Sequence, residues 1–339
     1  AGNATFETRH HRKSGSVQIA HVAASVVHVS GKTLVASVVN DITADRKSRE
    51  LIESHNRILE GIARSVALEI TLDALTRLAE SQYEGILASV LLLDPDGIHL
   101  RVGAAPSLPE DYNLAIDGAE IGEGVGSCGT AAFRRSAVHV DDIASDPLWK
   151  NYTSLAKHHG LAACWSIPVL DADGTVLGTF AIYSRHPGRM PLQLHSLMSS
   201  LVQTAAIAIR KKRDQHALRE SEHRWILALD AAGHGVWDWN PVTGHVFFSA
   251  RWKSMLGYEV GEISDHLDEW TTRVHPDDLA AAQAQLTDHL RGTTPVYRSE
   301  HRLRCKDGRW KWILDQGMAV ERLADGRALR VIGTHTDIS

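Results

Sequence analysis

The chain ends in the stretch Tyr297-Arg298-Ser299-Glu300-His301-Arg302-Leu303-Arg304-Cys305-Lys306-Asp307-Gly308-Arg309, which leads on to Asp337-Ile338-Ser339. A segment of the same kind stands near the start. It begins with Phe6-Glu7-Thr8-Arg9-His10-His11-Arg12-Lys13-Ser14-Gly15-Ser16 and closes at Asp41-Ile42-Thr43. Each copy predicts three antiparallel strands joined by tight turns. A supersecondary unit that recurs across most of a chain indicates repeated domains.

The first copy predicts an incomplete domain. Three strands over residues 6–43 cannot bury a hydrophobic core by themselves. We therefore expect a piece of a longer protein whose first domain lacks its front half. Val17, Ile19, His21 and Ala23 share one strand register, which predicts a half-buried strand.

Composition narrows the class of protein. The 339 residues suggest two or three domains, and the net charge of −5 gives no reason to expect a nucleic-acid partner. No apolar run approaches the roughly 20 residues that a membrane span needs. The three cysteines, Cys128, Cys164 and Cys305, are too few and too dispersed for a disulfide framework. We expect a cytoplasmic protein with no membrane span in this segment.

Two long helices are predicted. The first runs from about residue 44 to 78 with Thr43 as its N-cap, and carries a seam at spacings of four, three and four: Leu51, His55, Ile58 and Ile62. This seam either packs on its own domain or pairs with a second chain, and we favour the parallel dimer. The second helix starts near Leu192 and passes without Gly or Pro toward Arg224.

The final domain resembles a PAS domain of the type with a Trp-Asp-Trp first strand. The matching stretches are Gly235–Asn240, Phe248–Tyr258, Val274–Asp278, Lys306–Gly308 and Asp337–Ser339. Residues 6–43 look like the last three strands of another PAS domain.

The middle region is similar to a GAF domain, through Ile121–Ala132, Val138–Ile143, Ser166–Val169 and Val176–Tyr183. The resemblances imply an α+β protein with antiparallel sheets and long helical linkers. We expect a partial PAS domain over 1–44, a linker helix and GAF domain over 45–213, and a complete PAS domain over 214–339.

Such arrays usually regulate an output module in bacterial signalling. The sequence contains no Gly-Gly-Asp-Glu-Phe, no Glu-Ala-Leu and no kinase ATP-binding signature. The resemblance therefore implies a regulatory, non-enzymatic segment that binds an unknown small molecule and forms a homodimer through its linker helices. Cyclic-di-GMP turnover is the output that we expect downstream, with a histidine kinase as the alternative.

The GAF resemblance also implies a ligand pocket. Its expected lining is Cys128, Trp149, Tyr152, Cys164, Ser166 and Thr179. Gly124–Gly129 is a literal G-x-G-x-x-G, but no buried strand precedes it, as a dinucleotide site would require. We interpret it as a turn into a helix over Ser127–Arg134 whose free amides face the pocket.

The closing tripeptides are candidates for signal transmission. Asp41 with Thr43, and Asp337 with Ser339, place a carboxylate and a hydroxyl where a strand meets the outgoing helix. Both groups can accept hydrogen bonds from unpaired amides at a helix start. The alternative is a helix cap with no signalling role.

No cofactor or metal is predicted. The sequence spacing shows no zinc-ligand cluster, and haem is possible through one of five histidines: His158, His159, His234, His266 and His289. A rival function is a GAF-fold thiol enzyme of the methionine sulfoxide reductase type, which would use Cys128 and Cys164. Strand tryptophans such as Trp237, Trp239, Trp310 and Trp312 are expected in the core or in a domain contact, with a ligand-stacking box as the alternative.

Overall fold

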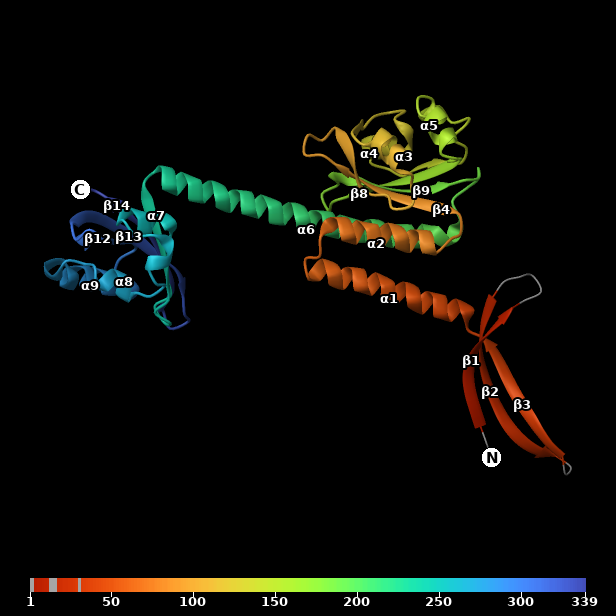
Figure 1. The fold of residues 1–339 in the computed structure, drawn as a ribbon, viewed down its shortest axis with the longest axis horizontal. Helices are drawn as coiled ribbons and strands as arrows, with labels where there is room; N and C mark the ends of the chain where they lie inside the picture. The colour runs from red at the N-terminus through yellow and green to blue at the C-terminus, as the bar shows by residue number, and fades with distance from the viewer. Residues whose placement is uncertain (1–2, 12–16, 30–31) are drawn as a thin grey trace. The chain divides into compact units, whose positions relative to one another are not determined.

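A computed structural model describes residues 3–11, 17–29 and 32–339 (Figure 1). The chain divides into two compact units, Ala1–Gln215 and His216–Ser339. All the strand pairs of the described residues are antiparallel. The predicted α+β class with antiparallel sheets is confirmed.

The first sheet consists of β1 (Asn3–His11), β2 (Val17–Val29) and β3 (Lys32–Asp41), in that order. The tight turn predicted around Ser14-Gly15 lies outside the described residues. The prediction for β2 chose the wrong register, because its buried residues are Ala20 and Val22. Strand β3 is exposed along its whole length, since so small a sheet has few neighbours to cover its faces.

The predicted helix over residues 44–78 is wrong as a single element. It is two helices, α1 (Thr43–Ala63) and α2 (Leu68–Ser81). Ser65 has φ 60°, and two hydrogen bonds close the end of α1: Ser65 N–H to Ile62 O and Val66 N–H to Gly61 O. This is a Schellman motif, which ends a helix and reverses the chain. No glycine stands at the left-handed position, so no local pattern in the sequence indicated the break.

The seam of α1 packs within its own chain. Ile58 and Ile62 are buried in one cluster with residues of α2 and α6 (Leu192–Ala231). His55 Nε2 lies 2.7 Å from Thr204 Oγ1 of α6, and Lys211 Nζ donates to Ile62 O at 2.5 Å. Our preference for this seam as a dimer surface is therefore wrong, because α6 already covers it.

The second and larger sheet of the first unit has six strands in the order β6-β5-β4-β9-β8-β7. Their bounds are Ile86–Leu93 (β4), His99–Ala104 (β5), Ala119–Glu120 (β6), Val138–Val140 (β7), Ala163–Leu170 (β8) and Val176–Ser184 (β9). Alternate residues of the central strands point to opposite faces. Figure 1 shows α2 and α6 on one side of this sheet and the shorter helices on the other.

The shorter elements of this unit are α3 (Glu110–Ile116), α4 (Gly126–Arg134), η1 (Pro147–Trp149) and α5 (Thr153–His158). They pack with Leu91, Cys164, Ala181 and Tyr183 in one apolar cluster. The other face, with Val90, Phe180 and Ile182, packs in the cluster of α2 and α6. The two faces therefore belong to two separate cores.

Helix α6 is continuous, as the sequence predicted, and its 40 residues run past the predicted end near Arg224 to Ala231. Among the described residues it is the one helix that is long and apolar enough to cross a membrane. However, 44% of its most apolar window is buried, including Leu194, Met198 and Leu201. Those residues pack in the core, as in the core helix of a globular domain.

The second unit has a five-stranded sheet in the order β11-β10-β14-β13-β12. The strands are His234–Trp239 (β10), Val246–Phe248 (β11), Tyr297–Arg304 (β12), Trp310–Arg322 (β13) and Ala328–Asp337 (β14); the helical elements are Ala250–Met255 (α7), Val260–Glu262 (η2), Asp268–Thr271 (α8) and Pro276–Leu290 (α9). Trp237 and Trp239 are buried, but Trp310 and Trp312 are 42% and 45% exposed. Of the two positions expected for the second pair, the core is therefore wrong, because β13 turns this face outward, and the domain contact stays a prediction.

Replacing Ser65 by glycine should stabilise the first unit. Glycine adopts a positive φ without the steric cost that serine meets, so we expect the free energy of unfolding to rise by about 1 kcal/mol. Chemical denaturation measures it. The control Glu60→Gly, within α1, should lower the same quantity by about 1 kcal/mol, and a loss of stability in Ser65→Gly would contradict the assignment.

Candidate functional site

A small pocket lies between α4 and the short-helix face of the first unit's sheet. Its volume is about 40 Å³, enough for a very small molecule. Side chains from three directions line it: the strands, the α3 region and the segment from α4 to α5. They are Leu91, Leu100, Tyr112, Ile116, Ala119, Val125, Gly126, Ser127, Cys128, Gly129, Trp149, Tyr152, Leu155 and Tyr183. The lining is almost wholly apolar.

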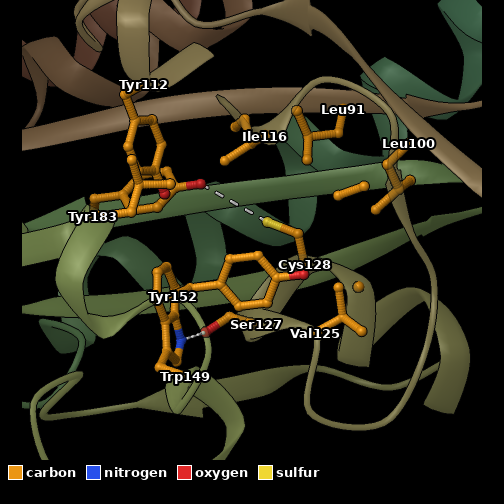
Figure 2. A pocket seen from close by; sticks show the side chains of 14 residues that line it. Leu91, Leu100, Tyr112, Ile116, Val125, Ser127, Cys128, Trp149, Tyr152 and Tyr183 are labelled. Atoms are coloured by element: carbon orange, nitrogen blue, oxygen red, sulfur yellow. Dashed lines mark hydrogen bonds between the residues drawn. The ribbon is translucent and has the colours of Figure 1, made fainter. Parts of the chain in front are cut away.

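Helix α4 brings the thiol of Cys128 into this pocket. Gly124 and Gly126 have φ 78° and 57°, which only glycine adopts easily, and the helix begins directly at this turn. Cys128 Sγ lies 3.9 Å from the hydroxyl of Tyr183 on β9 (Figure 2). The tyrosine ring packs edge-on against that of Tyr112 on α3, with 6.0 Å between centroids.

A second hydrogen-bonded pair fixes the opposite wall. Trp149 Nε1–H donates to Ser127 Oγ at 2.9 Å (Figure 2). The Ser127 hydroxyl in turn donates to the Cys164 carbonyl at 3.2 Å. All three residues are buried. The indole of Trp149 is thereby held against the start of α4.

Polar side chains lie behind Cys128 on the sheet. Ser166 on β8 and Thr179 on β9 are fully buried, and neither hydroxyl has a hydrogen-bond partner among the described residues. The buried hydroxyl of Thr130 on α4 also lacks a hydrogen-bond partner among the described residues. Buried polar groups are normally paired, so these three hydroxyls are unusual.

The environment favours the thiolate of Cys128. The neighbouring thiol of Cys164 lowers the pKa of Cys128 to about 7; burial opposes this, and the nearby hydroxyls of Ser166, Thr179 and Tyr183 lower it further. The Ser166 and Thr179 hydroxyls act by proximity, because neither makes a hydrogen bond of good geometry. Burial, followed by the interaction with Cys128, raises the pKa of Cys164. Cys128 is therefore the more acidic of the two thiols, and Cys164 is the one that stays protonated at neutral pH.

The structure groups the predicted site residues in two layers. Cys128, Trp149 and Tyr152 line the pocket, whereas Cys164, Ser166 and Thr179 do not appear in its lining. The chain places those three behind Cys128 on β8 and β9. Sequence reasoning missed Tyr183, which strand parity with Thr179 could have indicated. It also missed Tyr112, for which the sequence carries no signal.

The two closing tripeptides make the same set of contacts. In the first copy, Ile42 N–H donates to Ile19 O at 2.9 Å, Ile19 N–H donates to Thr43 Oγ1 at 2.9 Å, and Thr43 N–H donates to Asp41 Oδ1 at 3.0 Å. Thr43 is the first residue of α1 and Ile42 its N-cap. The predicted Thr43 cap is wrong, because its hydroxyl turns to strand β2.

In the second copy, Ile338 N–H donates to Trp312 O at 2.9 Å, Trp312 N–H donates to Ser339 Oγ at 3.0 Å, and Ser339 N–H donates to Asp337 Oδ1 at 3.1 Å. Burial would raise the pKa of Asp337, but hydrogen bonds from Lys311 and Ser339 lower it. We call this arrangement the strand latch. It joins the end of the last strand to its neighbouring strand.

Two groups of potential metal ligands come together from distant parts of the sequence, which the spacing did not reveal. They are Asp111, His158 and His159, and the buried set His301, Asp315 and His335. In the buried set, Trp252 Nε1–H donates to His335 Nδ1 at 2.8 Å and Trp270 Nε1–H donates to His301 Nε2 at 3.1 Å. These bonds occupy the lone pairs that a metal ion would need.

None of the haem histidines suggested by the sequence lines the pocket, although the His159 ring packs against Tyr112 of its wall. His158, His159, His234, His266 and His289 are all absent from its lining, as far as the described residues show. His289 is buried with both ring nitrogens in hydrogen bonds to backbone groups.

Comparison with known proteins identifies both units. Residues 63–210 match the family model of the GAF domain, and residues 245–335 match that of the PAS fold. The methyl sulfide methyltransferase-associated sensor of Methanosarcina acetivorans is 36% identical over 198 residues, which are 58% of this chain and 20% of that protein. This chain thus spans about a fifth of that relative's length.

Solved structures show further likenesses. A sensory box histidine kinase/response regulator from Burkholderia thailandensis is 36% identical, with a TM-score of 0.31, over 34% of this chain and 84% of that one. A domain of a two-component sensor histidine kinase protein from Sinorhizobium meliloti is 23% identical, with a TM-score of 0.38, over 46% and 99%.

The chain is thus a sensory, regulatory region of the kind that serves signal transduction. It carries a GAF domain and, after it, a PAS domain.

Alkylation of Cys128 should depend on pH with an inflection near 7. An ordinary thiol has a pKa near 8.5, so at pH 7 iodoacetamide should modify Cys128 faster than Cys305, whose pKa burial raises. Peptide mass spectrometry gives both rates. Cys164→Ala removes the neighbouring thiol and should move the inflection upward, whereas an inflection near 9 in the unaltered chain would refute the thiolate site.

Proposed function

We propose that a small molecule binding beside Cys128 regulates this sensory region, and that α6 carries the change toward the PAS domain and an output domain beyond it. The observation that carries the proposal is the sheet itself. Leu91 and Tyr183 line the pocket, while Val90 and Ile182, their immediate neighbours on the same strands, pack in the core of α6. A ligand that moves β4 or β9 must therefore act on α6.

The chemistry of the pocket suggests the kind of ligand. An apolar lining surrounds one thiolate and, behind it, hydroxyls without partners. A small, mainly apolar molecule with one hydrogen-bonding or electrophilic group would complement both. It must bind one packing of the domain better than another, or no signal passes.

The strand latch is the proposed relay at each PAS-type sheet. We propose that residues 1–44 are the end of a further PAS domain, because the latch of Asp41 and Thr43 repeats that of Asp337 and Ser339 bond for bond. A shift of the last strand would then reach the outgoing helix through these contacts.

The proposal also includes the cellular compartment of the protein and the enzyme that it regulates. We place the region in the cytoplasm, upstream of an enzyme of cyclic-di-GMP turnover or of a histidine kinase. The sensor-named relative and the two kinase-named structures support the kinase as readily as the cyclic-di-GMP enzyme. A bacterial source, expected from the resemblance, has no added support, since the sensor-named relative is archaeal.

A thermal-shift screen tests the pocket. Short-chain alcohols, ketones and carboxylic acids are added to the full chain, and at least one should raise the melting temperature of the GAF unit by several degrees. Cys128→Ser should weaken that effect, whereas the matched Cys305→Ser should not. Equal shifts in both variants, or none in the unaltered chain, would contradict the pocket as the sensor site.

A thiol enzyme is the second candidate function, because Cys128 and Cys164 are adjacent and their pKa values move in opposite directions. An assay with free methionine sulfoxide and a thiol reductant separates the two. Turnover that Cys128→Ser abolishes would establish the enzyme in place of the sensor.

We also propose a homodimer, now through α6. Leu218 and Trp225 lie seven residues apart and are 61% and 68% exposed, and Ile226 is exposed beside them. Such a stripe matches a coiled-coil seam.

Sedimentation equilibrium at micromolar concentration should give the mass of a dimer. The double change Leu218→Lys with Trp225→Lys should give a monomer, whereas Leu192→Lys, at an exposed residue at the other end of α6, should leave the dimer intact. A monomeric unaltered chain would rule out this interface.

A further inference from the structure

The PAS unit holds a second pocket, of about 30 Å³, inside its aromatic core. Its lining combines aromatic rings with a single acidic group. The residues are Trp237, Trp239, Val246, Phe248, Leu267, Trp270, Leu286, Tyr297, Asp315 and His335. The site described above makes no use of it.

Two glycines allow this arrangement. Gly317 of β13 and Gly333 of β14 are cross-strand partners, and a Cβ on either would come within 3 Å of the Trp237 indole. The ring therefore lies directly over the sheet. From there its Nε1–H donates to Asp315 Oδ1 at 2.8 Å.

Asp315 is a buried carboxylate, 3% exposed, with one N–H donor on each oxygen. Trp237 supplies the first, and His335 Nε2 lies 3.0 Å from Oδ2. Two N–H donors favour the ionised carboxylate. No Lys or Arg side chain pairs with Asp315 in any of the described segments, so the histidine decides whether the charge is balanced.

Contacts hold that histidine at both ring nitrogens. The indole N–H of Trp252 donates to His335 Nδ1, while Nε2 faces the Asp315 carboxylate. His301, the next titratable group, accepts from Trp270 in the same way, and burial lowers its pKa to about 4. His301 therefore supplies no positive charge at neutral pH.

The pocket therefore contains a buried carboxylate that no Lys or Arg side chain of the described residues pairs. Such a charge is costly, and in proteins it is normally paired. Two other buried atoms of the lining also lack partners in the structure as described, the Tyr297 hydroxyl and Trp239 Nε1. Tyr297 is 1% exposed and its pKa is raised, mainly by burial, so its hydroxyl stays protonated.

We propose that this PAS pocket binds a small organic ammonium ion, with its charge against Asp315 and its alkyl groups among the rings of Trp237, Trp239 and Trp270. Aromatic faces attract cations, and several rings around one site are typical of alkylammonium recognition. The Tyr297 hydroxyl is available to accept an ammonium N–H. An inorganic cation fits less well, because it needs several oxygen ligands and this lining offers few.

Methylammonium and methanol form a matched pair of probes, alike in size but different in charge. Each is titrated into the ¹⁵N-labelled full chain, and the indole N–H resonances are followed by NMR at constant ionic strength. Methylammonium should shift the Trp237 and Trp239 signals saturably, with at least tenfold tighter binding than methanol. Equal responses to both, or no saturable response to methylammonium, would overturn the proposal.

Variants then locate the charge. Asp315→Asn should weaken methylammonium binding at least tenfold, whereas the matched Asp307→Asn, an exposed acid in a turn of the same unit, should leave it unchanged. If Asp315→Asn does not fold, Trp239→Phe tests the aromatic part and should weaken binding roughly fivefold. Full affinity in a folded Asp315→Asn, or in Trp239→Phe, would refute the assigned site.

Discussion

The sheet of the GAF domain belongs to two hydrophobic cores at once, one on each face. Successive residues of β4 and β9 alternate between two cores, because strand side chains point to opposite faces. Leu91 borders the pocket and Val90 packs in the core of α6; Tyr183 and Ile182 do the same on the neighbouring strand. Closely packed interiors have few voids, so a displacement on one face is felt on the other.

In the PAS unit, too, a single strand takes part in two sites. Strand β14 carries Gly333 beneath the Trp237 indole, His335 beside Asp315, and Asp337 in the strand latch. One strand of ten residues thus connects the aromatic pocket to the end of the sheet. If the pocket binds a cation, Asp337 of the strand latch lies only two residues beyond His335, which lines the pocket.

Local patterns made most of the fold predictable. Turn residues and the repeat predicted the three closing strands of each copy, and the motifs of the two families indicated a GAF domain followed by a PAS domain. The break between α1 and α2 could not be found, because its left-handed residue is Ser65 and not a glycine. The seam of α1 was assigned to the wrong partner, since apolar spacing shows that a face is covered but not by what.

The candidate site was only partly predictable for a related reason. Cys128 follows the glycine turn, and Trp149 and Tyr152 follow a short strand, so motif reasoning could reach them. Tyr112 enters from α3 without a motif, and the set of His301, Asp315 and His335 spans three strands. Contacts between elements far apart in sequence depend on the register of the sheet, which local patterns do not determine.

Amide hydrogen exchange of the full chain, measured before and after alkylation of Cys128, shows whether the sheet couples the pocket to α6. The alkyl group occupies the pocket, so we expect altered protection in β9 and also in the part of α6 that packs behind it, around Met198 to Ala205. Changes confined to α4 and the pocket loops, with α6 unaffected, would contradict the claim that the sheet couples the pocket to the helix.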